Sequence, residues 1–121
     1  MATVFSGVVV AKVKGVTCVM LRLESIQQGS EIQCISDALE ELVEERGVEK
    51  LIVDFRAVEY FCSQMLSVLI DLNRDIQAVN GRLVLLGVHP RLQELFRITG
   101  IEKFFTFAPT EELALLLLNS E

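Results

Sequence analysis

The sequence predicts a single α/β domain over residues 1–121, with a mixed, mostly parallel β-sheet and about four α-helices packed on it. Short aliphatic and β-branched runs alternate with amphipathic segments of helical period. Lys14 and Gly15 separate the first two runs, which indicates an opening hairpin. The later elements follow one another through short connections, and parallel strands need helices as crossovers. The length allows one hydrophobic core and is too short for two ordinary domains.

The N-terminal third is predicted to form two antiparallel strands and a helix. The strands are Val4–Val13 and Val16–Leu23, both rich in β-branched residues. Ser30 and Gln33 have the spacing of a capping box, so the helix is expected to begin there and to end near Gly47. Its buried stripe would consist of Ile32, Ile35, Leu39 and Leu42.

The centre of the chain carries the strongest local pattern. Leu51–Val53 is a continuous apolar run, typical of a strand buried on both faces, and Asp54 marks its carboxyl end. From Met65 onward the period becomes helical, which places Ser63 at or near the N-cap. A serine hydroxyl there is expected to accept a backbone hydrogen bond, a cap typically worth about 1 kcal/mol. The apolar stripe of this helix would be Met65, Val68, Leu69, Leu72, Ile76 and Val79.

Another strand and helix are predicted after this central unit. Asn80-Gly81 ends the helix, and Arg82–Val88 has the composition of a further buried strand. Pro90 suits the first turn of the next helix, which is expected to stop at Thr99-Gly100 with the glycine in a left-handed conformation. Phe104 and Phe105 are predicted to form a short last strand.

The C-terminal segment is predicted to be a helix capped by Thr110. Its leucines are nearly consecutive, so the helix is apolar beyond one face. We expect some of them to dock on a neighbouring helix and others on a partner or on the second subunit of a homodimer. The leucines are Leu113, Leu115, Leu116, Leu117 and Leu118.

The acidic composition points to a protein partner. The net charge is −6 and the pI is about 4.8, which gives no basic footprint for nucleic acid or for an anionic membrane surface. The longest apolar run, Leu113–Leu118, is too short to cross a bilayer. Lys12 and Lys14 interrupt the apolar N-terminal stretch, which therefore does not have the pattern of a signal peptide. These features predict a cytoplasmic protein.

The side chains that could carry catalysis do not form a recognisable set. Cys62 could have thiolate character at a helix N-terminus, but the single histidine, His89, follows a different strand. Cys18 and Cys34 are interpreted as small core residues, and Asp54 as a brace for its loop. The glycines are scattered singly at turns, and no histidine cluster accompanies the carboxylates. No catalytic activity, metal or cofactor is predicted.

Two stretches of the chain resemble a known family. The sequence DFRAVEYFCSQMLSVL, followed by NGRLVLLGVHPRLQELFRITGIEKFF, is similar to the STAS domain of bacterial anti-sigma-factor antagonists. In that family a strand leads through an Asp-Ser-Ser/Thr-Gly-Leu loop into a helix. The resemblance covers about residues 4–118, and the Glu24–Ser30 region matches only loosely. Its most specific elements are Asp54, Val58, Ser63, Leu66, Gly81-Arg82-Leu83, Thr99-Gly100-Ile101 and Phe104.

The resemblance implies a partner-switching regulator. The unphosphorylated antagonist binds an anti-sigma factor that is a serine kinase of the histidine-kinase-like ATPase type; the kinase phosphorylates the loop serine, and the two separate. Ser63 occupies that serine's place. A phosphate there would meet unpaired N–H groups and the positive end of the helix dipole, so the surface would change while the scaffold stays. The expected partner-binding residues are Asp54, Arg56, Cys62, Ser63, Gln64 and Met65.

The loop departs from the family motif at three positions. Cys62 stands in place of the usual Asp, Gln64 in place of Ser or Thr, and Met65 in place of Gly. These departures bear on phosphorylation more than on the fold. They leave open an alternative function, a non-phosphorylated STAS module that acts as a protein-interaction or ligand-sensing adaptor.

Overall fold

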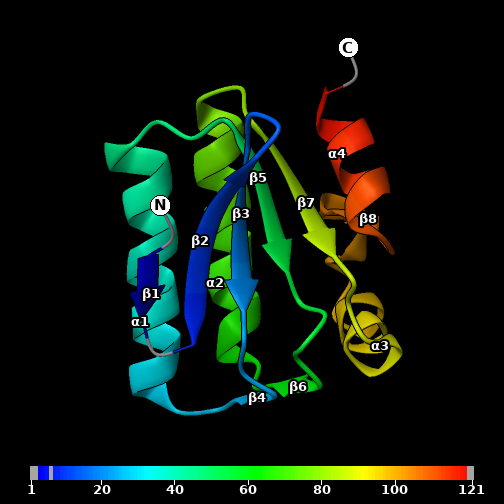
Figure 1. Ribbon diagram of the computed structural model, residues 1–121. Coiled ribbons are helices and arrows are strands. Elements are labelled where there is room, and N and C mark those ends of the chain that lie inside the picture. Colours follow the sequence, from blue (N-terminus) through cyan, green and yellow to red (C-terminus); the bar gives the residue numbers. More distant parts are fainter. Residues whose placement is uncertain (1–2, 6, 120–121) are drawn as a thin grey trace.

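The computed structural model describes residues 3–5 and 7–119 (Figure 1). Strands and helices alternate along most of the chain. The strands are β1 Thr3–Phe5, β2 Val8–Val13, β3 Val16–Leu21, β4 Ser25–Ile26, β5 Lys50–Asp54, β6 Tyr60–Phe61, β7 Arg82–Leu86 and β8 Thr106–Ala108. The helices are α1 Gly29–Glu40, α2 Gln64–Ala78, α3 Pro90–Ile98 and α4 Glu111–Asn119, with a π-helical turn η1 Glu41–Glu45 and a 3₁₀ turn η2 Glu102–Phe104.

The main sheet has the order β1-β2-β3-β5-β7-β8. The first three strands are antiparallel to one another, whereas β3, β5, β7 and β8 pair in parallel. Lys14 and Gly15 both have positive φ at the β2–β3 turn, which suits a type I′ hairpin. This arrangement confirms the predicted α/β fold with a mixed sheet.

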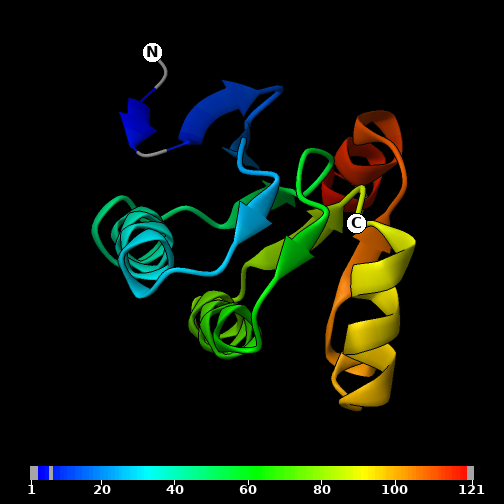
Figure 2. The ribbon, with the colours of Figure 1, turned by 90° about the horizontal axis from the view of Figure 1, so that it is seen from below.

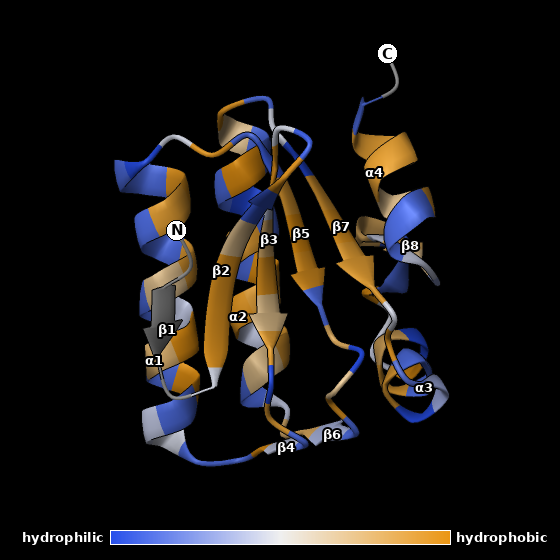
Figure 3. Cartoon of the chain, viewed as in Figure 1, coloured by the Kyte–Doolittle hydropathy of each residue, from blue (hydrophilic) through white to orange (hydrophobic). Residues whose placement is uncertain are grey.

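Helices cover the two faces of the sheet unequally. Helices α1 and α2 lie side by side on one face, and α4 lies on the other over β7 and β8 (Figure 2). The buried leucines of α4 therefore pack on strands, and the prediction that they dock on a neighbouring helix was wrong. Alternate residues of each central strand point to opposite faces of the sheet. On β5, Leu51 and Val53 join the core of α1 and α2, whereas Ile52 joins the cluster under α4. The central strands are therefore hydrophobic over most of their length (Figure 3).

The opening strand differs from the prediction. In place of one strand from Val4 to Val13, the chain forms β1 and β2, which pair antiparallel with Phe5 opposite Val8. Gly7 has φ +88°, a conformation that only glycine adopts readily, so the chain reverses there. Ser6, which the predicted strand also included, lies outside the described residues.

The first helix begins two residues earlier than predicted. Its N-cap is Gln28, and the Glu31 carboxylate accepts a hydrogen bond from the Gln28 backbone N–H at 3.3 Å. The capping box therefore lies at Gln28 and Glu31, and the Ser30–Gln33 assignment was wrong. The predicted stripe from Ile32 to Leu42 is buried, as expected.

The last strand also lies elsewhere than predicted. Phe104 belongs to the turn η2, and the strand β8 begins at Thr106. Phe105 packs edge-on against Phe96 with ring centroids 5.5 Å apart, so the segment is held by aromatic packing and not by strand pairing. The end of α3 is as expected, since Gly100 has φ +78°. No helix in the described part of the chain has the length and apolar content needed to cross a membrane.

Candidate functional site

Buried side chains anchor the loop after β5 to the hydrophobic core. Phe55, Val58 and Phe61 are each at most 1% exposed. The Phe61 ring lies 5.8 Å from the Phe55 ring and 6.1 Å from the Phe96 ring, and the Val58 N–H donates to the Phe55 carbonyl at 2.9 Å. The loop is therefore a rigid support for the residues that it exposes.

A small second sheet joins this loop to the one before α1. Strand β4 pairs in parallel with β6, at the end of the molecule opposite the β2–β3 hairpin (Figure 1). The Cys62 N–H donates to the Ile26 carbonyl at 3.0 Å, and the Cys62 thiol lies 3.8 Å from the Gln27 carbonyl oxygen. The two loops thus form one continuous surface.

Ser63 lies on this surface as the N-cap residue of α2 and is exposed. Its backbone is helical, with φ −59° and ψ −21°, and its hydroxyl makes no capping hydrogen bond within the described chain. The turn satisfies its own N–H groups instead: Met65 donates to the Cys62 carbonyl and Leu66 to the Ser63 carbonyl, both at 3.0 Å. The predicted position is confirmed, but the predicted side-chain cap was wrong.

Residues from both loops surround Ser63 on this surface. Tyr60 is 46% exposed, Gln64 is exposed and Cys62 is half-buried. Gln27 and Gln28, from the loop before α1, are also exposed. The sequence pattern did not identify Tyr60 or the two glutamines as site residues. The loose family match over Glu24–Ser30 was the available signal, and the β4–β6 pairing could not be read from two-residue strands.

Asp54 and Arg56 form a brace at the start of the loop. The Asp54 carboxylate, 6% exposed, accepts hydrogen bonds from the Arg56 backbone N–H at 2.9 Å, from Nε at 3.0 Å and from Nη2 at 2.7 Å. Hydrogen bonding to Asp54 raises the pKa of Arg56 above its ordinary value. The guanidinium also lies 3.9 Å from Glu111 at the start of α4.

The predicted site residues therefore fall into two groups. Cys62, Ser63 and Gln64 lie together on the exposed surface, whereas Met65 is fully buried in the core and Asp54 is buried beneath Arg56. The Arg56 guanidinium lies near Glu111 of α4, and α4 covers the sheet face opposite α2. The stripe of α2 is buried as predicted at Met65, Leu69, Leu72 and Ile76, whereas Val68 is half-buried and Val79 at the end is 44% exposed.

The reactive side chains do not assemble into a catalytic set in the described residues. His89 caps α3, where its Nδ1 accepts a hydrogen bond from the Arg91 N–H. Cys18 is buried as predicted, and burial, followed by the negative charges of Glu111 and Asp54, raises its pKa to about 11. Cys34 is only half-buried, contrary to the prediction. No group of metal-ligating side chains was found in the described ranges.

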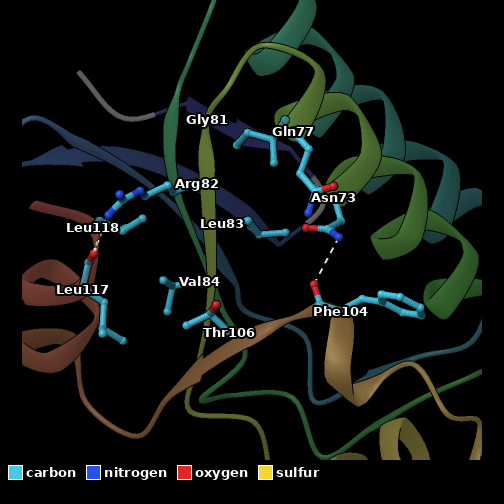
Figure 4. Close-up of a pocket in the computed structure, with 11 residues that line it drawn as sticks. Asn73, Gln77, Gly81, Arg82, Leu83, Val84, Phe104, Thr106, Leu117 and Leu118 are labelled. Carbon is cyan, nitrogen blue, oxygen red and sulfur yellow. Dashed lines mark hydrogen bonds between the residues drawn. The ribbon is translucent and has the colours of Figure 1, made fainter. Parts of the chain in front are cut away.

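One hollow of about 420 Å³ lies far from Ser63, at the edge of β7 that the short strand β8 leaves open (Figure 4). Two hydrogen bonds cross its walls: Asn73 donates to the Phe104 carbonyl at 3.2 Å, and Arg82 donates to the Leu117 carbonyl at 3.3 Å. Gln77 on its rim is 14 residues along α2 from Ser63, a rise of about 20 Å. This hollow is therefore separate from the loop surface.

A family model matches most of the chain. The model of the STAS domain family matches residues 8–114, and the chain belongs to this family. "Putative anti-sigma factor antagonist BtrV" of Bordetella bronchiseptica is 29% identical over 70 residues, a segment that spans 58% of this chain and 60% of that relative.

Solved structures show the same fold at low sequence identity. An anti-sigma-factor antagonist (STAS) domain protein from Planctomyces limnophilus has a TM-score of 0.84 at 22% identity, over 93% of this chain and 98% of the other. The Bacillus cell fate determinant SpoIIAA in its phosphorylated form has a TM-score of 0.71 at 18% identity, over 93% of this chain and 99% of the other.

Proposed function

We propose that this chain is an anti-sigma-factor antagonist that acts by partner switching, with Ser63 as the phosphorylated residue. The observation that carries the proposal is the position of Ser63: an exposed hydroxyl, not used for capping, on a rigid loop at the start of α2. A kinase can reach such a hydroxyl without unfolding the loop. The STAS family and the BtrV relative support the antagonist role.

The surface around Ser63 suits a switch based on charge. Four of the exposed residues around it, Tyr60, Gln27, Gln28 and Gln64, are uncharged, whereas Glu24 and Glu59 lie at the other end of the β4–β6 pair. A phosphate adds between one and a half and two negative charges at about pH 7. In a partner interface that buries this surface, the added charge would be costly to desolvate, so the complex would separate. The proposed partner is an anti-sigma factor of the serine-kinase ATPase type.

The three departures from the family motif affect the exposed surface unequally. Met65 in place of Gly lies fully inside the core, and Cys62 in place of Asp is half-buried against the Gln27 carbonyl. Gln64 is the only fully exposed change, and it is a neutral polar residue like the Ser or Thr that it replaces. Most of the surface that a kinase would read therefore stays compatible with phosphorylation.

One observation favours the second candidate, a non-phosphorylated interaction module. Cys62 stands directly before the serine, where the family motif has an acid, so a kinase that recognises that acid would not phosphorylate this loop. Such an adaptor would bind its partner constitutively through the same loop surface, and substitution of Ser63 would not release it.

The test is a binding titration of the purified chain against the anti-sigma-factor kinases encoded in the same genome. Ser63→Glu should weaken binding at least tenfold, which is about 1.4 kcal/mol, and Ser63→Ala should bind like the parent. Ser67→Glu, an exposed position one turn along α2, is the matched control and should bind normally. Equal binding by Ser63→Glu and the parent would reject the switch and favour the adaptor.

A further inference from the structure

The sheet face that carries α4 is only partly covered. Helix α4 packs on β7, β8 and β5, and its cluster also buries Val16 and Cys18 of β3. The outer part of that face, formed by β2 and the Met20 end of β3, has no helix over it in the described chain (Figures 1 and 2). The β2–β3 register places Val9 opposite Met20 and Val13 opposite Val16, on the same face as the cluster under α4. Val9, Val13 and Met20 are only half-buried, so apolar strand surface is left open.

Helix α4 extends this apolar surface with the outward-facing Leu116. Leu116 is 66% exposed, although Leu115 and Leu118 are buried against the sheet. A hollow of about 560 Å³ lies between the hairpin and α4, with its apolar wall formed by Val13, Leu115 and Leu116 and its rim by Lys14, Glu111, Glu112 and Asn119. A continuous apolar patch with a polar rim is typical of a protein interface.

The charges on the rim are arranged for self-association. Glu112 lies one turn before Leu116 on α4, and Lys14 lies at the tip of the hairpin, toward the other end of the helix; both are exposed. In a symmetric dimer, a twofold axis through the middle of the patch would place the hairpin tip of one copy against the start of α4 in the other copy. Lys14 of one copy would then face Glu112 of the other, and the pair would form twice.

We propose that this surface binds a second copy of the chain in an isologous dimer, with the two Leu116 side chains near the twofold axis and Lys14 opposite Glu112 of the second copy. The charge arrangement is the reason for choosing a second copy as the occupant. A chain with net charge −6 repels its own copies, so self-association needs opposite charges brought together at the contact.

The dimer would leave the loop surface free. Ser63 follows β6, at the end of the molecule opposite the hairpin that carries Lys14 (Figure 1). Each dimer would therefore present two switch loops, and a dimeric partner could engage both at once with increased avidity. The inference goes beyond the proposed switching function and does not depend on it, because self-association is measured without the partner.

The first test is sedimentation equilibrium of the purified chain over a concentration series. The parent should show a monomer–dimer equilibrium, and Leu116→Glu should weaken dimerisation at least tenfold. Ile98→Glu is the matched control, since Ile98 is 72% exposed on α3, outside the surface, and should dimerise like the parent. A parent that stays monomeric at millimolar concentration would overturn the proposal, as would a Leu116→Glu variant that dimerises like the parent.

A charge exchange tests the arrangement of the two copies. Lys14→Glu and Glu112→Lys should each weaken the dimer several-fold, and the double variant should recover most of the loss because the pair re-forms with reversed signs. Single variants that weaken association with no recovery in the double variant would overturn the twofold arrangement. Thermal unfolding of each variant checks that the fold is retained.

Cross-linking tests the axis directly. With Cys34 and Cys62 replaced by serine, Leu116→Cys should form a disulfide-linked dimer under mild oxidation, because residues near a twofold axis meet their own copies. Ile98→Cys in the same background should remain monomeric. Equal cross-linking of the two variants would contradict the proposed axis.

Discussion

Asp54 and Arg56 bind each other across the carboxyl end of β5, with the Arg56 guanidinium closing over a carboxylate that is almost fully buried. The stem of Arg56 lies against Gly87, where an added Cβ would come within 2.3 Å of Arg56 Cγ. The same guanidinium lies 3.9 Å from Glu111 of α4. This one side chain therefore connects the ends of β5 and β7 with the start of the terminal helix.

Removing this brace should destabilise the domain. Arg56→Ala leaves the buried Asp54 carboxylate without its guanidinium, and we expect a loss of about 1–3 kcal/mol in the free energy of unfolding. Chemical denaturation measures it. Arg74→Ala, which removes an exposed ion pair with Asp71, is the control and should change stability by less than about 0.5 kcal/mol. Equal effects of the two substitutions would show that the brace is not structural.

The end of α3 gives a second stability prediction. Gly100 has φ +78° with open space around its Cβ direction, so backbone conformation alone should decide the cost of a substitution. Gly100→Val should lower the free energy of unfolding by more than about 1 kcal/mol, since a β-branched residue is strained there. Gly100→Asn should lose less, because asparagine tolerates positive φ. An unchanged melting temperature for Gly100→Val would contradict the strained position.

Periodicity and turn residues predicted most of the fold because they act locally. The Lys14-Gly15 hairpin, the buried Leu51–Val53 strand and the Pro90 helix all form where the sequence places them. The misplaced elements depend on a single turn residue and on side-chain packing, which periodicity does not report. The chain reverses at Gly7, inside a run that is otherwise mostly apolar, and Phe105 is held by the Phe96 ring and not by strand pairing.

Two predicted helix caps should now differ in their contribution to stability. The Thr110 hydroxyl accepts a hydrogen bond from the Leu113 N–H at 3.2 Å, so Thr110→Ala should cost about 1 kcal/mol. Ser63→Ala should cost clearly less, because the Ser63 hydroxyl does not cap α2. Denaturant titration of both variants makes the comparison. A loss of about 1 kcal/mol in Ser63→Ala would mean that the hydroxyl does cap the helix in solution.

Cys18 should make stability depend on pH in the alkaline range. Its pKa in the folded chain is about 11, against an ordinary value of 9.0, so the folded state keeps the proton longer than the unfolded state does. The free energy of unfolding should therefore fall as pH rises from about 9 to 11, by about 2–3 kcal/mol at about 1.4 kcal/mol per pKa unit. Cys18→Ala should show a smaller fall over the same range. If the free energy of unfolding fell equally with pH in the parent and in Cys18→Ala, the buried thiol would not be the group that keeps its proton in the folded state.

The candidate site was predicted only in part, for a physical reason. The family motif located Ser63 at the start of α2, but the same motif cannot distinguish residues that face a partner from those that support the loop. Met65 and Asp54 are buried supports, whereas Tyr60 joins the exposed surface because β6 pairs with β4. Such an assignment requires the packing of two loops that are 30 residues or more apart in sequence.

The most direct test of the central claim is phosphosite mapping. The chain is incubated with its cognate anti-sigma-factor kinase and Mg-ATP, digested and analysed by tandem mass spectrometry, with Ser63→Ala treated in parallel. The account predicts phosphate on Ser63 in the parent and none in Ser63→Ala. Phosphate only on Ser67 or Thr99, or none at all with a kinase that demonstrably binds, would contradict Ser63 as the switch and favour the constitutive adaptor.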